Sequence, residues 1–241
     1  MPDHDPRVLI VTTSNGVMGD TGKPTGFHWE ELATPYHAFT DAGFGVVIAS
    51  IRGGRPPYDP GSLAEHPAER PASVRRFLDD QAALRLLDET RPIAEVPAGD
   101  FDAIYLPGGH GTMWDLPGNP ALAAALSATA ERDGVVSAVC HGPAGFVGVR
   151  RSDGRPLVEG RRINAFTDAE ERKVGLDGTV PFLLETKLRE AGAVFEGAEP
   201  FAAKVVEDGP LITGQNPASA QPLAEAVIAA VRARRARQAA E

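Results

Sequence analysis

The only cysteine in the sequence, Cys140, follows a strand-like apolar run at residues 134–139 and precedes His141 and a Gly-Pro pair. A nucleophile at such a strand-to-helix turn is presented at the edge of a sheet, where small neighbours allow a tight bend. The start of a helix there stabilises a thiolate, so we expect the pKa of Cys140 to be lowered. We predict that Cys140 is a nucleophile with His141 as an adjacent acid or base; the alternative is an inert buried cysteine.

A glycine-rich turn, residues 107–111 (Pro-Gly-Gly-His-Gly), follows a second strand-like run and is expected at the same sheet edge. Its backbone N–H groups, together with that of His141, are suited to hold an oxyanion near the thiol. No Gly-Lys-Ser/Thr segment follows, so phosphate binding is not expected, and an ordinary strand-to-helix turn is the alternative. The predicted oxyanion- and substrate-binding residues are Gly108, Gly109, His110 and Gly142.

Two neighbouring carboxyl groups, Glu30 and Glu31, lie in the first turn of an expected helix at residues 29–42. The start of a crossover helix lies at the same end of the sheet as the thiol, so one carboxyl can reach it. A glutamate buried beside a thiol has a raised pKa and can donate a proton to sulfur or substrate. The alternative is a glutamate that only complements the helix dipole. The residues alone do not choose between the two.

The elements that position these groups alternate between strand and helix. Parallel-type buried strands are expected at residues 7–13, 44–50, 101–106 and 134–139, and helices at 29–42, 73–89, 120–133, 180–191 and 217–235. Residues 194–195 and 204–213 are predicted to form a terminal hairpin that turns at Asp208-Gly209. This order predicts an α/β fold with a mostly parallel sheet. We predict one domain over residues 1–241, with a loop insertion at 52–69 and a small cap-like insertion at 150–175.

Composition narrows the possible partners and the compartment. The 241 residues carry a formal charge of −9, which argues against nucleic acid or an anionic membrane as a partner. A single cysteine excludes an internal disulfide and a Cys-paired zinc site, and no ligand spacing predicts another metal site. No apolar run approaches a membrane span, and the first residues lack the pattern of an export signal. We therefore expect a cytoplasmic protein without cofactor or metal.

Four segments together resemble the ThiJ/PfpI superfamily, which has the class I glutamine amidotransferase-like fold. The resemblance covers essentially the whole chain, and its closing segment and the 52–69 loop resemble the branch of glutathione-independent glyoxalase III enzymes and a related heat-shock chaperone. It implies a flavodoxin-like three-layer sandwich with helices on both faces of the sheet, a small insert after the nucleophile turn, and a homodimer. The segments are residues 25–36, 107–111, 138–143 and 213–219.

The resemblance also implies roles for individual residues. Cys140 matches the family's nucleophile and His141 the histidine beside it. The family's glutamate lies four residues before a proline, which favours Glu31 over Glu30. A further acidic residue that orients the histidine falls in residues 166–171, where the register favours Glu171, then Glu170, then Asp168. A solvated acidic helix start is the alternative for these three.

These implications predict a glyoxalase III type hydro-lyase that converts methylglyoxal or a similar 2-oxoaldehyde to a 2-hydroxy acid through the Cys140 thiolate. Glutamine hydrolysis is not expected, because the sequence lacks the distant His-x-Glu segment of true glutamine amidotransferases. The alternative is a holdase chaperone or a redox-responsive thiol protein without turnover. A PfpI-like peptidase and a protein deglycase are further alternatives.

Overall fold

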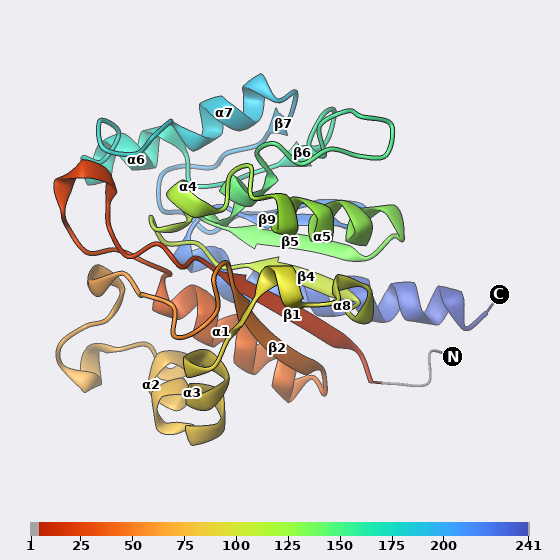
Figure 1. The fold of residues 1–241 in the computed structure, drawn as a ribbon, viewed down its shortest axis with the longest axis horizontal. Helices are drawn as coiled ribbons and strands as arrows, with labels where there is room; N and C mark the ends of the chain where they lie inside the picture. The colour runs from red at the N-terminus through yellow and green to blue at the C-terminus, as the bar shows by residue number, and fades with distance from the viewer. Residues whose placement is uncertain (1–4, 241) are drawn as a thin grey trace.

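Within residues 5–240, which the computed structural model describes, a seven-stranded sheet runs through the middle of the molecule (Figure 1). The strand order is β3-β2-β1-β4-β5-β9-β8, and all neighbours are parallel except the β8–β9 hairpin. The strands are β1 (Arg7–Thr12), β2 (Gly45–Ser50), β3 (Arg91–Pro92), β4 (Ala103–Leu106), β5 (Val135–Val139), β8 (Val205–Asp208) and β9 (Leu211–Gly214).

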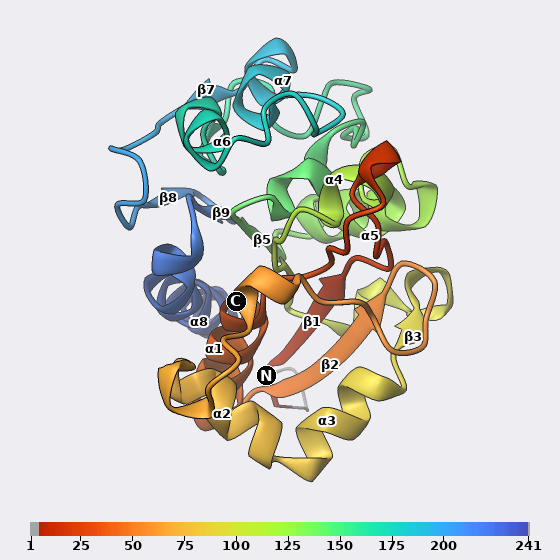
Figure 2. The same cartoon turned by 90° about the vertical axis from the view of Figure 1, so that its left-hand side faces the viewer.

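Helices cover both faces of this sheet (Figure 2). The helices α1 (Trp29–Asp41), α2 (Ala72–Asp79), α3 (Gln81–Asp88) and α8 (Ala220–Gln238) share one apolar cluster with the sheet. On the other face lie α4 (Thr112–Asp115) and α5 (Pro120–Glu131), while α6 (Asp168–Val174) and α7 (Leu184–Glu190) lie beyond β9. The predicted three-layer, flavodoxin-like sandwich is confirmed.

The continuous apolar runs of the central strands follow from burial on both faces. In β1, Leu9 and Val11 face the α5 side, whereas Val8 and Ile10 face the α1 side, and all four are fully buried. A strand covered by helices on both sides needs apolar residues at every position, rather than at alternate ones. Burying this much apolar surface is the main stabilisation of the sheet.

Several predicted boundaries are wrong. The helix expected at 73–89 is two helices, because the side chain of Asp80 accepts hydrogen bonds from the N–H groups of Ala82 and Ala83 and starts α3. The helix expected at 180–191 begins only at Leu184. Residues 194–195 form β7 (Val194–Phe195), which pairs in parallel with β6 (Arg162–Ile163) in a separate small sheet and not with the hairpin. The two-residue strand β3 was not predicted.

The proposed insertions have little regular structure of their own. Residues 52–69 contain two short 3₁₀ turns, and residues 150–175 contain β6 and α6. The division of the chain into one domain with these two insertions stays a prediction, and its ends, residues 1–4 and 241, lie outside the described residues, as does the start of the segment inspected for an export signal. No helix in the described part of the chain has the length and apolar character to cross a bilayer.

The sheet brings the two predicted loops together. Leu106 at the end of β4 pairs with Ala138 near the end of β5, so the residues that follow these strands leave the sheet side by side. The N–H of His28, directly before α1, donates to the carbonyl oxygen of Gly108 at 3.0 Å. The start of α1, the glycine loop and the turn at Cys140 therefore meet at the carboxyl end of the sheet, where ligands bind in open α/β folds.

Candidate active site

Cys140 occupies a sharp, strained turn between β5 and a short 3₁₀ helix, Gly142–Phe146. Its φ of 59° lies in the left-handed region that residues with a Cβ rarely adopt. The turn is held because the N–H of Cys140 donates to Gly214 O at 2.9 Å and its carbonyl oxygen accepts from the N–H of Phe166 at 2.8 Å. Backbone strain of this kind concentrates at functional sites.

Gly142 supports this turn from behind and does not line the cavity at Cys140. A Cβ at Gly142 would collide with the carbonyl oxygen of Leu106. The residue is therefore required for close approach of the turn to β4, and the expectation that it binds substrate is corrected to a packing role.

The glycine loop supplies backbone N–H donors in two directions. Gly109, with a φ of 100°, and His141 both direct their N–H groups at the Cys140 sulfur. The N–H of Gly108 instead donates to Glu31 Oε2 at 2.7 Å, so it is not free to bind a substrate oxygen. This corrects the expectation for Gly108: it positions Glu31, and the two donors nearest the sulfur belong to Gly109 and His141.

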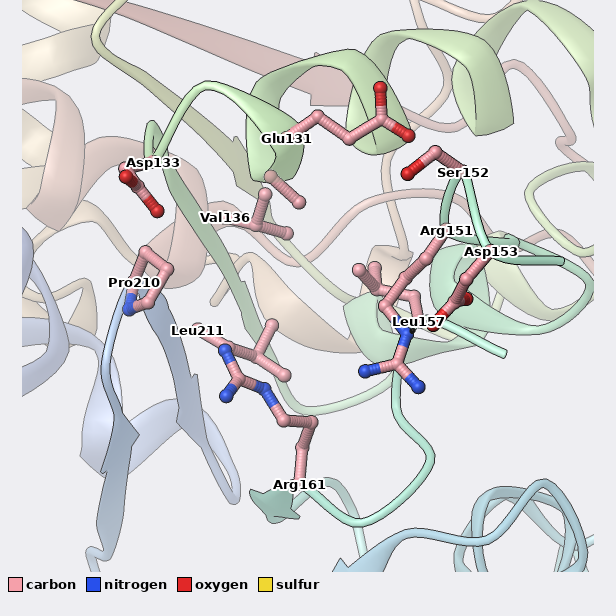
Figure 3. Close-up of a pocket in the computed structure, with 11 residues that line it drawn as sticks. Glu131, Asp133, Val136, Arg151, Ser152, Asp153, Leu157, Arg161, Pro210 and Leu211 are labelled. Atoms are coloured by element: carbon pink, nitrogen blue, oxygen red, sulfur yellow. Dashed lines mark ion pairs between the residues drawn. The ribbon is translucent and has the colours of Figure 1, made fainter. Parts of the chain in front are cut away.

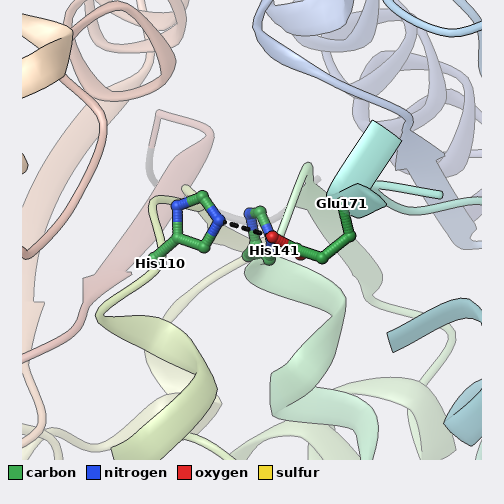
Figure 4. Close-up of side chains that lie close together, drawn as sticks. All are labelled: His110, His141 and Glu171. Carbon is green, nitrogen blue, oxygen red and sulfur yellow. Dashed lines mark hydrogen bonds and ion pairs between the residues drawn. The ribbon is translucent and has the colours of Figure 1, made fainter. Parts of the chain in front are cut away.

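A hydrogen-bonded line runs from the sulfur through His141 to Glu171. Cys140 Sγ lies 3.3 Å from His141 Nδ1, and His141 Nε2 lies 2.7 Å from Glu171 Oε2. The other carboxyl oxygen, Glu171 Oε1, lies 2.9 Å from His110 Nε2, and Figure 4 shows both histidines directed toward this carboxylate. A cysteine, a histidine and an acidic residue in this order form the arrangement of a histidine-activated thiol.

The charge states along this line follow from its contacts. Burial favours a raised pKa for Glu171, but hydrogen bonds from His110 and His141 outweigh it and lower the pKa to about 2. Burial and the nearby His110 lower the pKa of His141, while Glu171 opposes them. At neutral pH an ionised Glu171 therefore faces a neutral His141, which can accept the thiol proton and become an imidazolium beside a fixed negative charge.

On the other side of the sulfur, Glu31 is fully buried. Desolvation raises its pKa to about 8, against the opposing effects of its hydrogen bonds with Cys140 and with the Gly108 N–H. Glu30 is only half-buried and points elsewhere, so the choice that the sequence left open falls on Glu31. Glu31 is a neutral carboxylic acid at neutral pH, able to donate a proton.

The expectation of a lowered pKa for Cys140 is wrong. Burial, followed by the charge of Glu31, raises the pKa of the thiol well above its ordinary value, although the N–H groups of His141 and Gly109 lower it. The side chain is 4% exposed, and the helical segment after it is only five residues long. Desolvation thus outweighs the stabilisation expected from a helix start. These surroundings favour the thiol over the thiolate, and His141 Nδ1, 3.3 Å from the sulfur, is the nearest group that can accept its proton.

The other two acidic candidates do not contact His141. Glu170 accepts hydrogen bonds from Thr167 in a capping box at the start of α6, and also from Asn216 Nδ2 at 2.9 Å. Asp168 accepts from the Thr186 hydroxyl. Of the three carboxylates in this segment, Glu171 alone lies within hydrogen-bond distance of His141.

A cavity of about 350 Å³ opens onto the sulfur. Its lining includes the predicted His110, Cys140, His141 and Gly109, and also residues that the sequence analysis did not single out. Three of them, Asp59, Gly61 and Ser62, belong to the loop expected at residues 52–69. The additional lining residues are His28, Asp59, Gly61, Ser62, Phe166, Val174, Phe201 and Pro217.

A second cavity, of about 450 Å³, lies away from this site (Figure 3). Val136, Leu157 and Leu211 form its apolar part, and Arg151 and Arg161 point into it opposite Glu131. It is larger than the cavity at Cys140, but its lining includes neither a cysteine nor a histidine that could activate the Ser152 hydroxyl, so it is not the candidate active site.

His110, His141 and Glu171 are also the one set of residues among 5–240 whose donor atoms lie close enough together to suggest a metal ligand set, all within 4.8 Å. Two imidazoles and a carboxylate suit Zn²⁺. A metal ion bound there would coordinate His141 Nε2, the nitrogen that is hydrogen-bonded to Glu171. Metal binding would therefore break the hydrogen bond between His141 and Glu171.

The fold and site define a class of α/β proteins with a cysteine on a strained turn after a central strand. The chain belongs to the DJ-1/PfpI family, whose model matches residues 24–230. It is 33% identical over 227 residues to the glutathione-independent glyoxalase HSP31 of Saccharomyces cerevisiae, covering 89% of this chain and 93% of the relative.

Two solved structures extend the comparison. The crystal structure of glyoxalase III from Candida albicans is 30% identical, with a TM-score of 0.84 over 93% of this chain and 97% of the other. Rapid Encystment Protein 24 KDa of Francisella tularensis is 35% identical, with a TM-score of 0.90 over 94% of this chain and 99% of the other. The similarity thus spans almost the entire length of each protein.

Proposed function

We propose that this protein is an enzyme, a glutathione-independent glyoxalase that converts a 2-oxoaldehyde such as methylglyoxal to a 2-hydroxy acid. The observation that carries the proposal is the position of the Cys140 sulfur between a group that can accept a proton and a group that can donate one. Neutral His141, backed by ionised Glu171, lies on one side, and the neutral acid Glu31 lies on the other. The names of the relatives HSP31 and glyoxalase III support the same activity.

The first step joins the substrate to the enzyme. His141 Nδ1 takes the thiol proton as sulfur attacks the aldehyde carbon, C1, and a C–S bond forms while the C=O π bond opens. The N–H groups of Gly109 and His141, which are directed at the sulfur, are near enough to stabilise the oxygen on the attacked carbon. Protonation of that oxygen gives a hemithioacetal.

The second step moves hydrogen between the two substrate carbons. The C1 proton is removed and a proton is delivered to C2 through an enediol, with Glu31 and His141 as the exchanging groups. C1 is oxidised and C2 is reduced by the same two electrons, so no external oxidant or cofactor is needed. Water then hydrolyses the resulting thioester to the 2-hydroxy acid and releases the thiol. The net change is addition of one water, as in a hydro-lyase.

Replacement of Cys140 tests the proposal. In Cys140→Ala we expect methylglyoxal loss and lactate formation to fall to the uncatalysed rate, because no covalent intermediate can form. Unfolding temperature and circular dichroism of the variant serve as controls for folding. A variant that keeps the wild-type rate would exclude this mechanism, and suppression of protein aggregation that survives the substitution would favour the chaperone alternative.

The assembly and compartment of the protein are proposals of the same kind. We propose a homodimer in the cytoplasm, with a small 2-oxoaldehyde as the only partner the site requires, because the family resemblance implies these properties. Analytical ultracentrifugation and cell fractionation test them.

A further inference from the structure

The cavity at Cys140 has two chemically different walls. Part of the lining is polar: it consists of Asp59 and Ser62, from the loop at residues 52–69, and of the imidazole of His28. The apolar part of the lining, called the apolar wall from here on, comes from a different part of the chain, after the nucleophile turn. It consists of Phe166, Val174, Phe201 and Pro217.

The apolar wall begins directly beside the reacting sulfur. The ring of Phe166 lies 4.6 Å from the ring of His141 and 6.3 Å from the ring of Phe201. The N–H of Phe166 donates to the carbonyl oxygen of Cys140 at 2.8 Å, which fixes the distance between this wall and the nucleophile. Aromatic rings therefore follow one another from His141 through Phe166 to Phe201 along the lining of the cavity.

Phe201 is unusual both in exposure and in backbone conformation. Its side chain is 48% exposed, and its φ of 67° lies in the left-handed region, which is a genuine outlier for a bulky residue. Val174, also on this wall, is 43% exposed. Large apolar side chains exposed around a concave site mark a ligand-binding surface more often than a structural one.

A buried polar network holds Phe201 in this conformation. Its N–H donates to Glu170 Oε1 at 2.8 Å, and the same oxygen accepts from Asn216 Nδ2 at 2.9 Å. Asn216 Nδ2 also donates to Ala202 O at 2.8 Å. Both Glu170 and Asn216 are buried, so the strained backbone at residues 201–202 is clamped from two sides. The network gives a structural role to Glu170 and to the Gln-Asn-Pro segment at residues 215–217, neither of which takes part in the proposed reaction.

We propose that Phe201, with Phe166 and Val174, forms a subsite for the non-reacting substituent of the 2-oxoaldehyde, so that the enzyme prefers substrates with an aromatic-sized apolar group over methylglyoxal. The proposal rests on the function proposed above. An apolar substituent on C2 of a substrate bound to Cys140 gains most by contact with the apolar wall, because contact with the polar lining residues would remove water from groups that need hydrogen bonds. The cavity volume of about 350 Å³ falls in the range that holds ligands much larger than a three-carbon aldehyde.

The first experiment compares kcat/KM for phenylglyoxal and methylglyoxal in the wild type and in Phe201→Ala. We expect the wild type to favour phenylglyoxal, and the substitution to lower the phenylglyoxal-to-methylglyoxal ratio about tenfold, mainly through KM, since a hydrophobic contact is lost equally from bound substrate and transition state. A wild-type preference for methylglyoxal, or an equal loss for both substrates, would overturn the subsite.

Two controls separate the ring from the backbone and from general effects. Phe201→Gly also removes the ring but suits the left-handed φ, so it should shift the ratio as Phe201→Ala does; a shift in the alanine variant alone would assign the effect to backbone strain. Val194→Ala changes an exposed valine on β7 outside the cavity and should leave both values unchanged.

A second readout does not depend on turnover. The rate of alkylation of Cys140 by 2-bromoacetophenone relative to bromoacetone, each divided by its rate with free glutathione, should exceed one in the wild type and fall in Phe201→Ala. If no 2-oxoaldehyde is turned over but this ratio behaves as expected, the proposed function fails and the subsite stands. If turnover occurs and both ratios are insensitive to residue 201, the function stands and the subsite fails.

Discussion

A buried glutamate lies on each side of the Cys140–His141 pair. At neutral pH one of the two carboxyl groups is neutral and the other is ionised. Glu31, at the start of α1, has a pKa raised to about 8, whereas Glu171, on α6, has a pKa lowered to about 2. Both are less than 3% exposed. Burial raises the pKa of both groups: it decides the charge of Glu31, whereas at Glu171 the contacts with His110 and His141 outweigh it.

The donors differ clearly between the two regions. Glu171 receives two imidazole contacts, at 2.7 and 2.9 Å, that gain strength when either ring is protonated. Glu31 receives one backbone N–H, from Gly108, and lies beside a thiol whose ionisation it opposes. The N-terminal turn of α1 favours a negative charge at Glu31, but desolvation is the larger effect. Similar side chains thus supply a proton donor on one side and a fixed charge on the other.

Of the substitutions that test the difference between Glu31 and Glu171, we expect Glu31→Gln to lower kcat most. The amide keeps a hydrogen-bond donor and the shape but cannot exchange a proton, so kcat for methylglyoxal should fall by about 10²- to 10⁴-fold. Glu30→Gln is the matched control, since Glu30 is the neighbouring, half-buried glutamate that does not contact the thiol, and it should retain wild-type kcat. Equal losses in the two variants would contradict the role of Glu31.

Glu171→Gln should have the next largest effect, a fall in kcat of roughly 10²-fold, because the imidazolium formed at His141 loses its fixed counter-charge. Glu171 raises the pKa of His141, so its removal should also move the acid limb of the pH–rate profile to lower pH. A loss of stability alone would lower the rate without moving this limb. Glu171→Asp, which keeps the charge, should restore part of the activity and return the limb toward its wild-type position.

The pH dependence of the wild type should follow Glu31. Its acidic proton is present below a pKa of about 8, so kcat should decrease about tenfold per pH unit as the pH rises above that value. In Glu31→Gln the remaining slow rate should lack this alkaline limb. An alkaline limb that persists unchanged in the variant would assign it to another group, and the measurement is a pH series of initial rates with each enzyme.

The smallest predicted effect is on stability, and it has opposite sign in the two regions. Between pH 4.5 and about 8, Glu31 is protonated in the fold but ionised in the unfolded chain, so its contribution to the free energy of unfolding falls as the pH rises through this range. Glu31→Gln should therefore stabilise the protein at pH 8, by roughly 1–3 kcal/mol in urea unfolding.

Glu171 behaves conversely. Its folded pKa of about 2 lies below the ordinary 4.5, so its stabilising contribution is fully present above pH 4.5 and is lost as the pH falls toward 2. Glu171→Gln should be destabilising at pH 7 and progressively less so in acid. The same sign of effect for both variants at pH 8 would contradict the assigned charge states.

The fold was predictable to the extent that local pattern determined it. The buried runs around Ile10, Ile48, Ile104 and Val136 predicted the parallel strands, because burial on both faces leaves a continuous apolar signature. The two-residue strand β3 carries no such signature, since its formation depends on a partner far away in the chain. Short strands at residues 162–166 and 194–195 were expected from the sequence, but their pairing as β6 and β7 was not, for the same reason. The break between α2 and α3 was missed because Asp80 acts through its cap, not through hydropathy.

By itself, the sequence determined which groups are candidates for the reaction: one cysteine after a strand, a histidine beside it, a glycine loop after another strand, and acidic residues at the starts of two helices. These are properties of residue type and of short spacing. The family resemblance already favoured Glu31 and Glu171, and the tertiary structure places Glu31 at the thiol and Glu171 at His141. Only the tertiary structure decided the charge of each glutamate, the raised pKa of the thiol, and the apolar wall that Phe201 adds to the cavity. Those properties depend on desolvation and on hydrogen bonds between segments 30 to more than 100 residues apart, and a carboxyl or thiol group has no fixed pKa until the fold has removed its water and chosen its neighbours.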